Sequence, residues 1–123
     1  MKYLILIHRN PRSRELWEGF SEEQQAQGYA AYAALDEELA ASGELIVSEA
    51  LADASMAKRV TVENGRVLAT DGPFAEVKEQ LAGIYLVDCE SVERAVEIAG
   101  RIPGADYLAV EVRPVLDLGA FDL

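Results

Sequence analysis

Hydrophobic and β-branched residues gather in short runs along this chain of 123 residues. Runs of this length, bounded by turn residues, are typical of strands. They fall at 2–8, 44–51, 81–89 and 107–115. In segment 58–71, Asn64-Gly65 stands between two β-rich stretches, which is the strongest short-range signal for a hairpin. The pattern therefore predicts four single strands and one hairpin.

Two other segments carry apolar residues at helical spacing. Ser21 and Gln24 form a capping box, and the helix that they begin is expected to run to about Ala41. Ser91 is placed to cap the second helix. Residues 9–20 are basic and carry no clear period, so we expect them to be irregular.

The order of these elements is strand, helix, strand, hairpin, strand, helix, strand. Right-handed crossovers would put both helices on the same side of one sheet. The expected fold class is therefore α+β, a ferredoxin-like βαβ-hairpin-βαβ arrangement with an antiparallel sheet, in a single domain over residues 1–123. An open α/β sheet is the alternative, but the hairpin and the small number of helices disfavour it.

The first strand is apolar on both sides, because Leu4 and Leu6 point one way while Ile5 and Ile7 point the other. One side of the last strand mixes apolar, aromatic and charged groups. A sheet face of this kind is rarely left uncovered. We therefore expect a homodimer in which two sheet faces pack together around a partly polar cavity.

The composition narrows the choice of partners. A net charge of −11 and a pI of about 4.4 argue against nucleic acid and against an anionic membrane surface. Cys89 is the sole cysteine, which fits a reducing compartment. The apolar run at the N-terminus is shorter than a secretory signal, and no run approaches the roughly 18–20 residues of a membrane span. We expect a cytoplasmic protein.

A family resemblance covers essentially the whole chain. "DGPFAEVKEQLAGIYLVD" (71–88) is preceded by "MKYLILIH" and followed by "RIPGADYLAVEVRPV". In this order the segments resemble the DGPF-domain branch of the YciI-related family. The resemblance implies a dimeric ferredoxin-like α+β barrel of bacterial origin with no settled activity. Some DGPF proteins are associated with extracytoplasmic-function sigma factors, which implies a link to regulation.

One branch of the wider family includes a dehydrochlorinase that acts on a chlorinated hydroxyhydroquinone. Its acid–base residues are a His and an Asp, and the His lies on the first helix. The first helix expected here, residues 21–42, contains no histidine, because the sole histidine is His8 at the end of the first strand. That mechanism cannot be transferred to this chain residue by residue.

His8 and Asp71 are the candidate catalytic pair. His8 is the sole side chain whose unperturbed pKa lies near neutrality, so it could act as a general base in the dimer cavity. The alternative is a partly exposed or interface histidine bonded to a backbone carbonyl. Asp71 could hold a carboxylate at the cavity mouth, or simply accept N–H bonds within its own turn.

Four further residues are candidates for binding a small molecule, namely Lys78, Glu79, Tyr85 and Arg113. Lys78 could contact an anion, and Glu76 with Glu79 would share a face of a helical turn; the alternative is a solvated charged patch. Arg113 could bind a carboxylate or pair with Glu111. No nucleotide or flavin motif occurs, and one His with one Cys cannot build a typical transition-metal site, so we expect no cofactor and no metal.

Two functions remain open on these grounds. The first is a cofactor-free small-molecule enzyme that uses lyase-like acid–base chemistry in a dimer cavity. The second is a non-catalytic ligand-binding or regulatory module, with a link to a sigma-factor pathway. Loss of turnover without loss of fold in His8 or Asp71 variants would separate them.

Overall fold

The computed structural model describes residues 1–74 and 78–120 of the chain. The main sheet has four antiparallel strands in the order β2-β5-β1-β6, which span Leu45–Ala50, Gln80–Asp88, Lys2–Arg9 and Ala109–Pro114. Strands β3 and β4 pair separately, over Lys58–Glu63 and Arg66–Asp71. The helices are α1 (Pro11–Glu18), α2 (Glu22–Ala41) and α3 (Val92–Gly100), with short 3₁₀ turns η1 (Ala54–Met56) and η2 (Leu118–Ala120). The predicted α+β class with an antiparallel sheet is confirmed.

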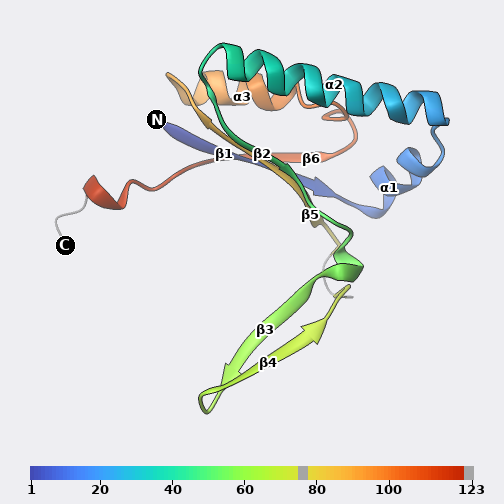
Figure 1. Cartoon of the computed structure of the whole chain (residues 1–123), viewed down its shortest axis with the longest axis vertical. Helices are drawn as coiled ribbons and strands as arrows, with labels where there is room; N and C mark the ends of the chain where they lie inside the picture. Colours follow the sequence, from blue (N-terminus) through green and yellow to red (C-terminus); the bar gives the residue numbers. More distant parts are fainter. Residues whose placement is uncertain (75–77, 121–123) are drawn as a thin grey trace.

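Helices α2 and α3 lie on the same side of the main sheet (Figure 1), as right-handed crossovers require. The side chains of Ile5 on β1 and Val87 on β5 are fully buried beneath them. Leu39 from α2 and Ile98 from α3 are equally buried from the opposite layer. The core is therefore a two-layer contact between one face of the sheet and one face of each helix.

The short helix α1 was not predicted, because residues 9–20 were expected to be irregular. Asn10 accepts a 2.8 Å hydrogen bond from the Ser13 backbone N–H, and Ser13 Oγ accepts a 2.9 Å bond from the Asn10 N–H. This capping box starts the helix, and Pro11 occupies its first position. Proline at that position has the φ angle that a helix needs and loses no hydrogen bond, so it favours the start of a helix.

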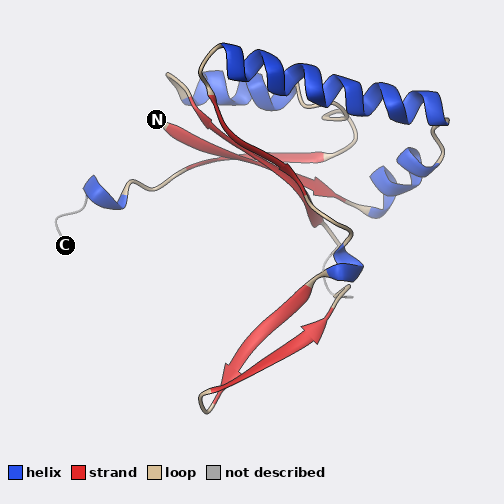
Figure 2. Cartoon of the chain, in the orientation of Figure 1, coloured by secondary structure: helices blue, strands red, loops and turns tan. Residues whose placement is uncertain are grey.

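The other face of the main sheet has no helix over it among the described residues (Figure 2). Strand register places Leu4 opposite Leu86 and Leu6 opposite Ile84 on neighbouring strands. All four side chains are half-buried by their neighbours in the sheet. We call this surface the helix-free face.

The β3–β4 hairpin stands away from the main sheet (Figure 1), and every residue of its two strands is exposed. Asn64 and Gly65 form its turn with φ angles of 50° and 77°, as a two-residue type I′ turn requires. Val62 pairs with Val67, and Val60 pairs with Ala69, so one side of the hairpin is apolar. Isolated two-stranded hairpins are marginally stable in water, and this one carries an uncovered apolar stripe.

None of the helices in residues 1–74 and 78–120 is long and apolar enough to span a bilayer.

Candidate functional site

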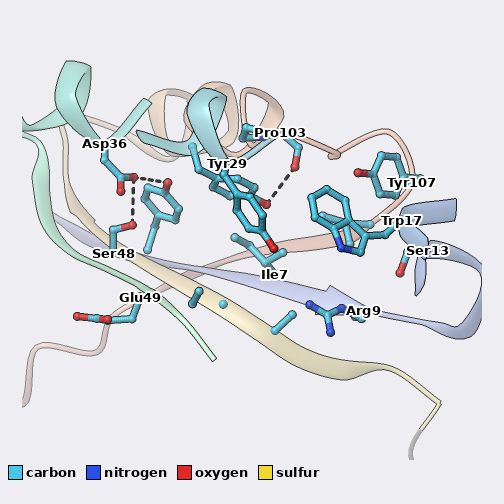
Figure 3. A pocket seen from close by; sticks show the side chains of 16 residues that line it. Ile7, Arg9, Ser13, Trp17, Tyr29, Asp36, Ser48, Glu49, Pro103 and Tyr107 are labelled. Atoms are coloured by element: carbon cyan, nitrogen blue, oxygen red, sulfur yellow. Dashed lines mark hydrogen bonds between the residues drawn. The ribbon is translucent and has the colours of Figure 1, made fainter. Parts of the chain in front are cut away.

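A cavity of about 300 Å³ opens between the helix layer and the main sheet (Figure 3). The sheet supplies its floor through Ile7 on β1 and Gly83 on β5. Five aromatic side chains from four parts of the chain enclose it: Trp17, Tyr29, Tyr32, Tyr85 and Tyr107. A cavity of this size, mostly apolar with a few polar groups, is typical of small-ligand sites.

Asp36 on α2 is the centre of the polar group at one end of this cavity. Ser48 on β2 donates a 3.1 Å hydrogen bond to Asp36 Oδ1, and the Tyr85 hydroxyl on β5 donates to the same oxygen. Neither of these bonds ends on Oδ2. The carboxylate is thus held by two strands through one oxygen, and its second oxygen accepts no hydrogen bond from the described residues (Figure 3).

Burial raises the pKa of three tyrosines of the cavity, Tyr32, Tyr85 and Tyr107. It raises the pKa of Tyr32 to about 12, and the Tyr32 hydroxyl donates a 3.0 Å bond to the Pro103 carbonyl. Burial is also the main cause that raises the pKa of Tyr85, and the bond to Asp36 adds to it. Burial likewise raises the pKa of Tyr107. The hydroxyls of Tyr32 and Tyr85 are hydrogen-bond donors, to the Pro103 carbonyl and to Asp36.

The opposite end of the cavity is formed by α1 and the last residue of β1. The Trp17 ring lies edge-on to Tyr29, with 5.4 Å between ring centroids. A Cβ atom at Gly28 on α2 would approach Trp17 Cζ3 to 3.2 Å, so glycine makes room for the indole. Arg9 lies beside this aromatic pair, and Asp36 lies at the far end of the same cavity (Figure 3).

The site residues predicted from the sequence lie in separate parts of the structure. Tyr85 lines the cavity, whereas His8 is not among the lining residues. His8 Nε2 is 3.7 Å from Glu111 Oε1, and Glu111 also accepts a 2.9 Å bond from Arg113 Nε. Glu111 thus brings His8 and Arg113 together at the helix-free face, on the other side of the sheet from the cavity.

Asp71 lies at the end of the hairpin, on a different sheet from His8. Its carboxylate forms a 2.6 Å ion pair with Lys58, and its side chain is 78% exposed. Next to it, a Cβ atom at Gly72 would come within 2.5 Å of the Ala54 carbonyl oxygen, so this position accepts glycine alone. Arg59 lies 4.0 Å over the Phe74 ring. The described part of the DGPF motif therefore makes contacts that stabilise the base of the hairpin. No described contact joins His8 to Asp71, and their joint action stays a prediction.

Lys78 and Glu79 are both exposed. Glu79 and Phe74 line a shallow hollow at the base of the hairpin, together with residues of the 51–57 segment. Glu76 lies outside the described residues. The proposed role of this charged patch in ligand binding stays a prediction.

Sequence reasoning missed Asp36 and Ser48, which come together only when α2 packs on β2. One signal was available: Asp36 follows Tyr32 by four residues and Leu35 by one, so it borders the apolar stripe of its helix. A carboxylate beside a stripe that packs on the sheet needs polar partners there, and Ser48 and Tyr85 are those partners.

Comparison with known proteins identifies the family. The sequence profile of the YCII-related domain matches residues 1–119. The chain belongs to the YCII-related family. It is also 30% identical over 117 residues to the uncharacterized protein R00369 of Rhizobium meliloti (strain 1021), covering 94% of this chain and 92% of that protein. The family is thus confirmed, while membership of the DGPF branch stays a prediction.

A solved structure shares the fold. It is 5-chloro-2-hydroxyhydroquinone dehydrochlorinase (TftG) from Burkholderia phenoliruptrix AC1100, in complex with 2,5-dihydroxybenzoquinone. The two chains superpose with a TM-score of 0.54 over 99% of this chain and 100% of the other, at 18% sequence identity. At this level of identity the likeness establishes the arrangement of helices and strands alone.

Proposed function

We propose that this YCII-related protein is a cofactor-free enzyme that acts on a small hydroxylated aromatic compound in the helix-side cavity. The observation that carries the proposal is the placement of Asp36 in an aromatic-walled cavity, with Tyr85 and Ser48 bound to one carboxylate oxygen and the other oxygen left over. Such a group, oriented by neighbours and placed in a cavity, is suited to general acid–base catalysis.

The shape of the cavity supports an aromatic ligand. About 300 Å³ suits a single ring with a few substituents. Tyr29 and Trp17 present ring faces and edges to it, and aromatic pairs of this kind favour a flat apolar ligand. A hydroxyl on such a ring would donate to Asp36 Oδ2.

The chemistry follows from a proton acceptor beside a phenol. Asp36 would take the proton of one ring hydroxyl and deliver it to a ring carbon that carries a leaving group. Loss of the proton of a second ring hydroxyl would then expel the leaving group, which departs with the electrons of its bond to carbon. For chlorohydroquinone the products are benzoquinone, chloride and one proton, so no oxidant or cofactor is required. The named activity of the dehydrochlorinase that shares the fold is consistent with this lyase-like class.

Titration with hydroquinone and turnover of chlorohydroquinone would test the proposal. We expect calorimetry to detect hydroquinone binding, and we expect that binding to change the emission of Trp17, because the sole tryptophan lines the cavity. Chlorohydroquinone should release chloride, measured with an ion-selective electrode. Binding without chloride release would favour the non-catalytic ligand-binding module instead. No binding, or binding that leaves Trp17 emission unchanged, would contradict the proposal.

We also propose that two copies of the chain pack through the helix-free face. Leu4, Leu6, Ile84 and Leu86 form an apolar surface there, and no described helix covers it. Burial of such a surface against an identical one would remove apolar area from water. The exposed apolar side of the hairpin adds a second uncovered surface on the same molecule.

Replacing Leu6 by glutamate should convert the dimer to a monomer, because the charge would be buried between two copies without a partner. The measurement is light scattering after size exclusion, where two chains of 13.4 kDa are expected for the unmodified protein. Val96→Glu is the matched control, since Val96 is 56% exposed on α3 in the helix layer. A monomeric unmodified protein, or dissociation by Val96→Glu alone, would count against the interface.

A further inference from the structure

Arg9 is a cation that lines the cavity. Within residues 1–74 and 78–120, its guanidinium takes part in no ion pair and no hydrogen bond. Arg14, five residues further along, forms an ion pair with Asp53 instead. In a chain with twice as many acidic as basic residues, a half-buried arginine with no carboxylate beside it is unusual. A guanidinium placed in this way is available to an anionic ligand.

The charges of the cavity are separated along its length. Among the lining residues, Arg9 is the sole cation, and the two carboxylates are Asp36 and Glu49. Both carboxylates lie at the far end from Arg9, with Tyr29 between the two ends (Figure 3). An anionic substituent would be attracted to the Arg9 end and repelled from the Asp36 end. The cavity therefore favours one orientation of any ligand that has an anionic group at one end and a neutral polar group at the other.

We infer that the ligand is an aromatic monocarboxylate with a ring hydroxyl, its carboxylate on Arg9 and its hydroxyl on Asp36. This inference rests on the proposed function and names the substrate class of the same site. A planar guanidinium matches a carboxylate through two parallel hydrogen bonds. One unpaired cation balances one negative charge, which favours a carboxylate over a doubly charged phosphate. The ring lies between the two ends against Trp17 and Tyr29.

Two probes that differ by one carboxylate test this assignment, namely hydroquinone and 2,5-dihydroxybenzoate. The unmodified protein should bind 2,5-dihydroxybenzoate at least about tenfold more tightly by calorimetry, which is the size expected for a hydrogen-bonded charge pair. Arg9→Gln should abolish this preference and leave hydroquinone affinity within about twofold. Arg12→Gln, an exposed arginine on α1 outside the cavity lining, is the matched control and should keep the preference.

The outcomes separate this inference from the proposed function. Equal affinity for the two probes in the unmodified protein, or a preference that survives Arg9→Gln, would overturn the inference and leave an aromatic-binding cavity in place. Loss of hydroquinone binding in Arg9→Gln would also overturn it, since Arg9 would then maintain the cavity itself. Failure of the unmodified protein to bind either probe would remove the proposed function as well.

Discussion

Replacement of Asp36 by asparagine is expected to lower kcat for chloride release from chlorohydroquinone by about 10²–10⁴-fold, the usual contribution of a general acid–base group. Both protein bonds to this side chain end on Oδ1, and an amide oxygen can accept both of them. The amide nitrogen would stand in place of Oδ2 and cannot take up a proton. The substitution thus removes the proton acceptor and keeps the local packing.

The measurement is initial-rate kinetics together with calorimetric binding of hydroquinone. We expect affinity for hydroquinone to change much less than kcat, because the aromatic walls are intact. Glu49→Gln is the matched control, since Glu49 is the other carboxylate at that end and is exposed on β2. A full rate in Asp36→Asn, or an equal loss in Glu49→Gln, would rule out Asp36 as the proton acceptor.

Truncation of Ile98 to alanine is expected to lower the free energy of unfolding by about 2–5 kcal/mol. Ile98 lies on α3, is 0% exposed and belongs to the core between the helices and the sheet. Removal of its side chain loses buried apolar surface and leaves a cavity that the neighbouring residues fill only in part. The loss is large compared with the 5–15 kcal/mol by which domains are usually stable.

Urea unfolding at one fixed protein concentration measures this effect, since association of two chains would otherwise change the apparent stability. Val96→Ala on the same helix is the control, because Val96 is 56% exposed, and its effect should stay within about 0.5 kcal/mol. No side chain of α3 lines the cavity, so Ile98→Ala should retain hydroquinone affinity below its unfolding transition. Equal destabilisation by both variants would contradict the assignment of the core.

Local patterns were sufficient for most elements of the fold. The capping box of Ser21 and Gln24 starts α2 as expected, and Asn64-Gly65 turns the hairpin. These signals depend on a few neighbouring residues, so they can be read without knowledge of the rest of the chain. The same kind of signal is present for α1 in Asn10 and Ser13, but these residues lie in the stretch 9–20, which was expected to be irregular.

The sequence predicted much less of the candidate site than of the fold. Tyr85 was selected, whereas Asp36, Ser48 and Arg9 were not assigned to a site. The sheet has two faces, and the cavity expected from the sequence lay on the helix-free face, where His8 and Arg113 lie with Glu111 between them. A cavity on the helix side requires the angle and spacing of α2 over β5, which no local pattern specifies.

The sequence by itself determined the order of the strands and of helices α2 and α3, the hairpin and the family, because these depend on short-range patterning and on matches along the chain. The tertiary structure alone decided that Asp36 meets Tyr85, 49 residues away, and that Arg9 forms no ion pair or hydrogen bond within the described residues. Such pairings arise when two layers pack and side chains distant in sequence are desolvated together. Their geometry depends on the whole core, and so it appears only in the folded chain.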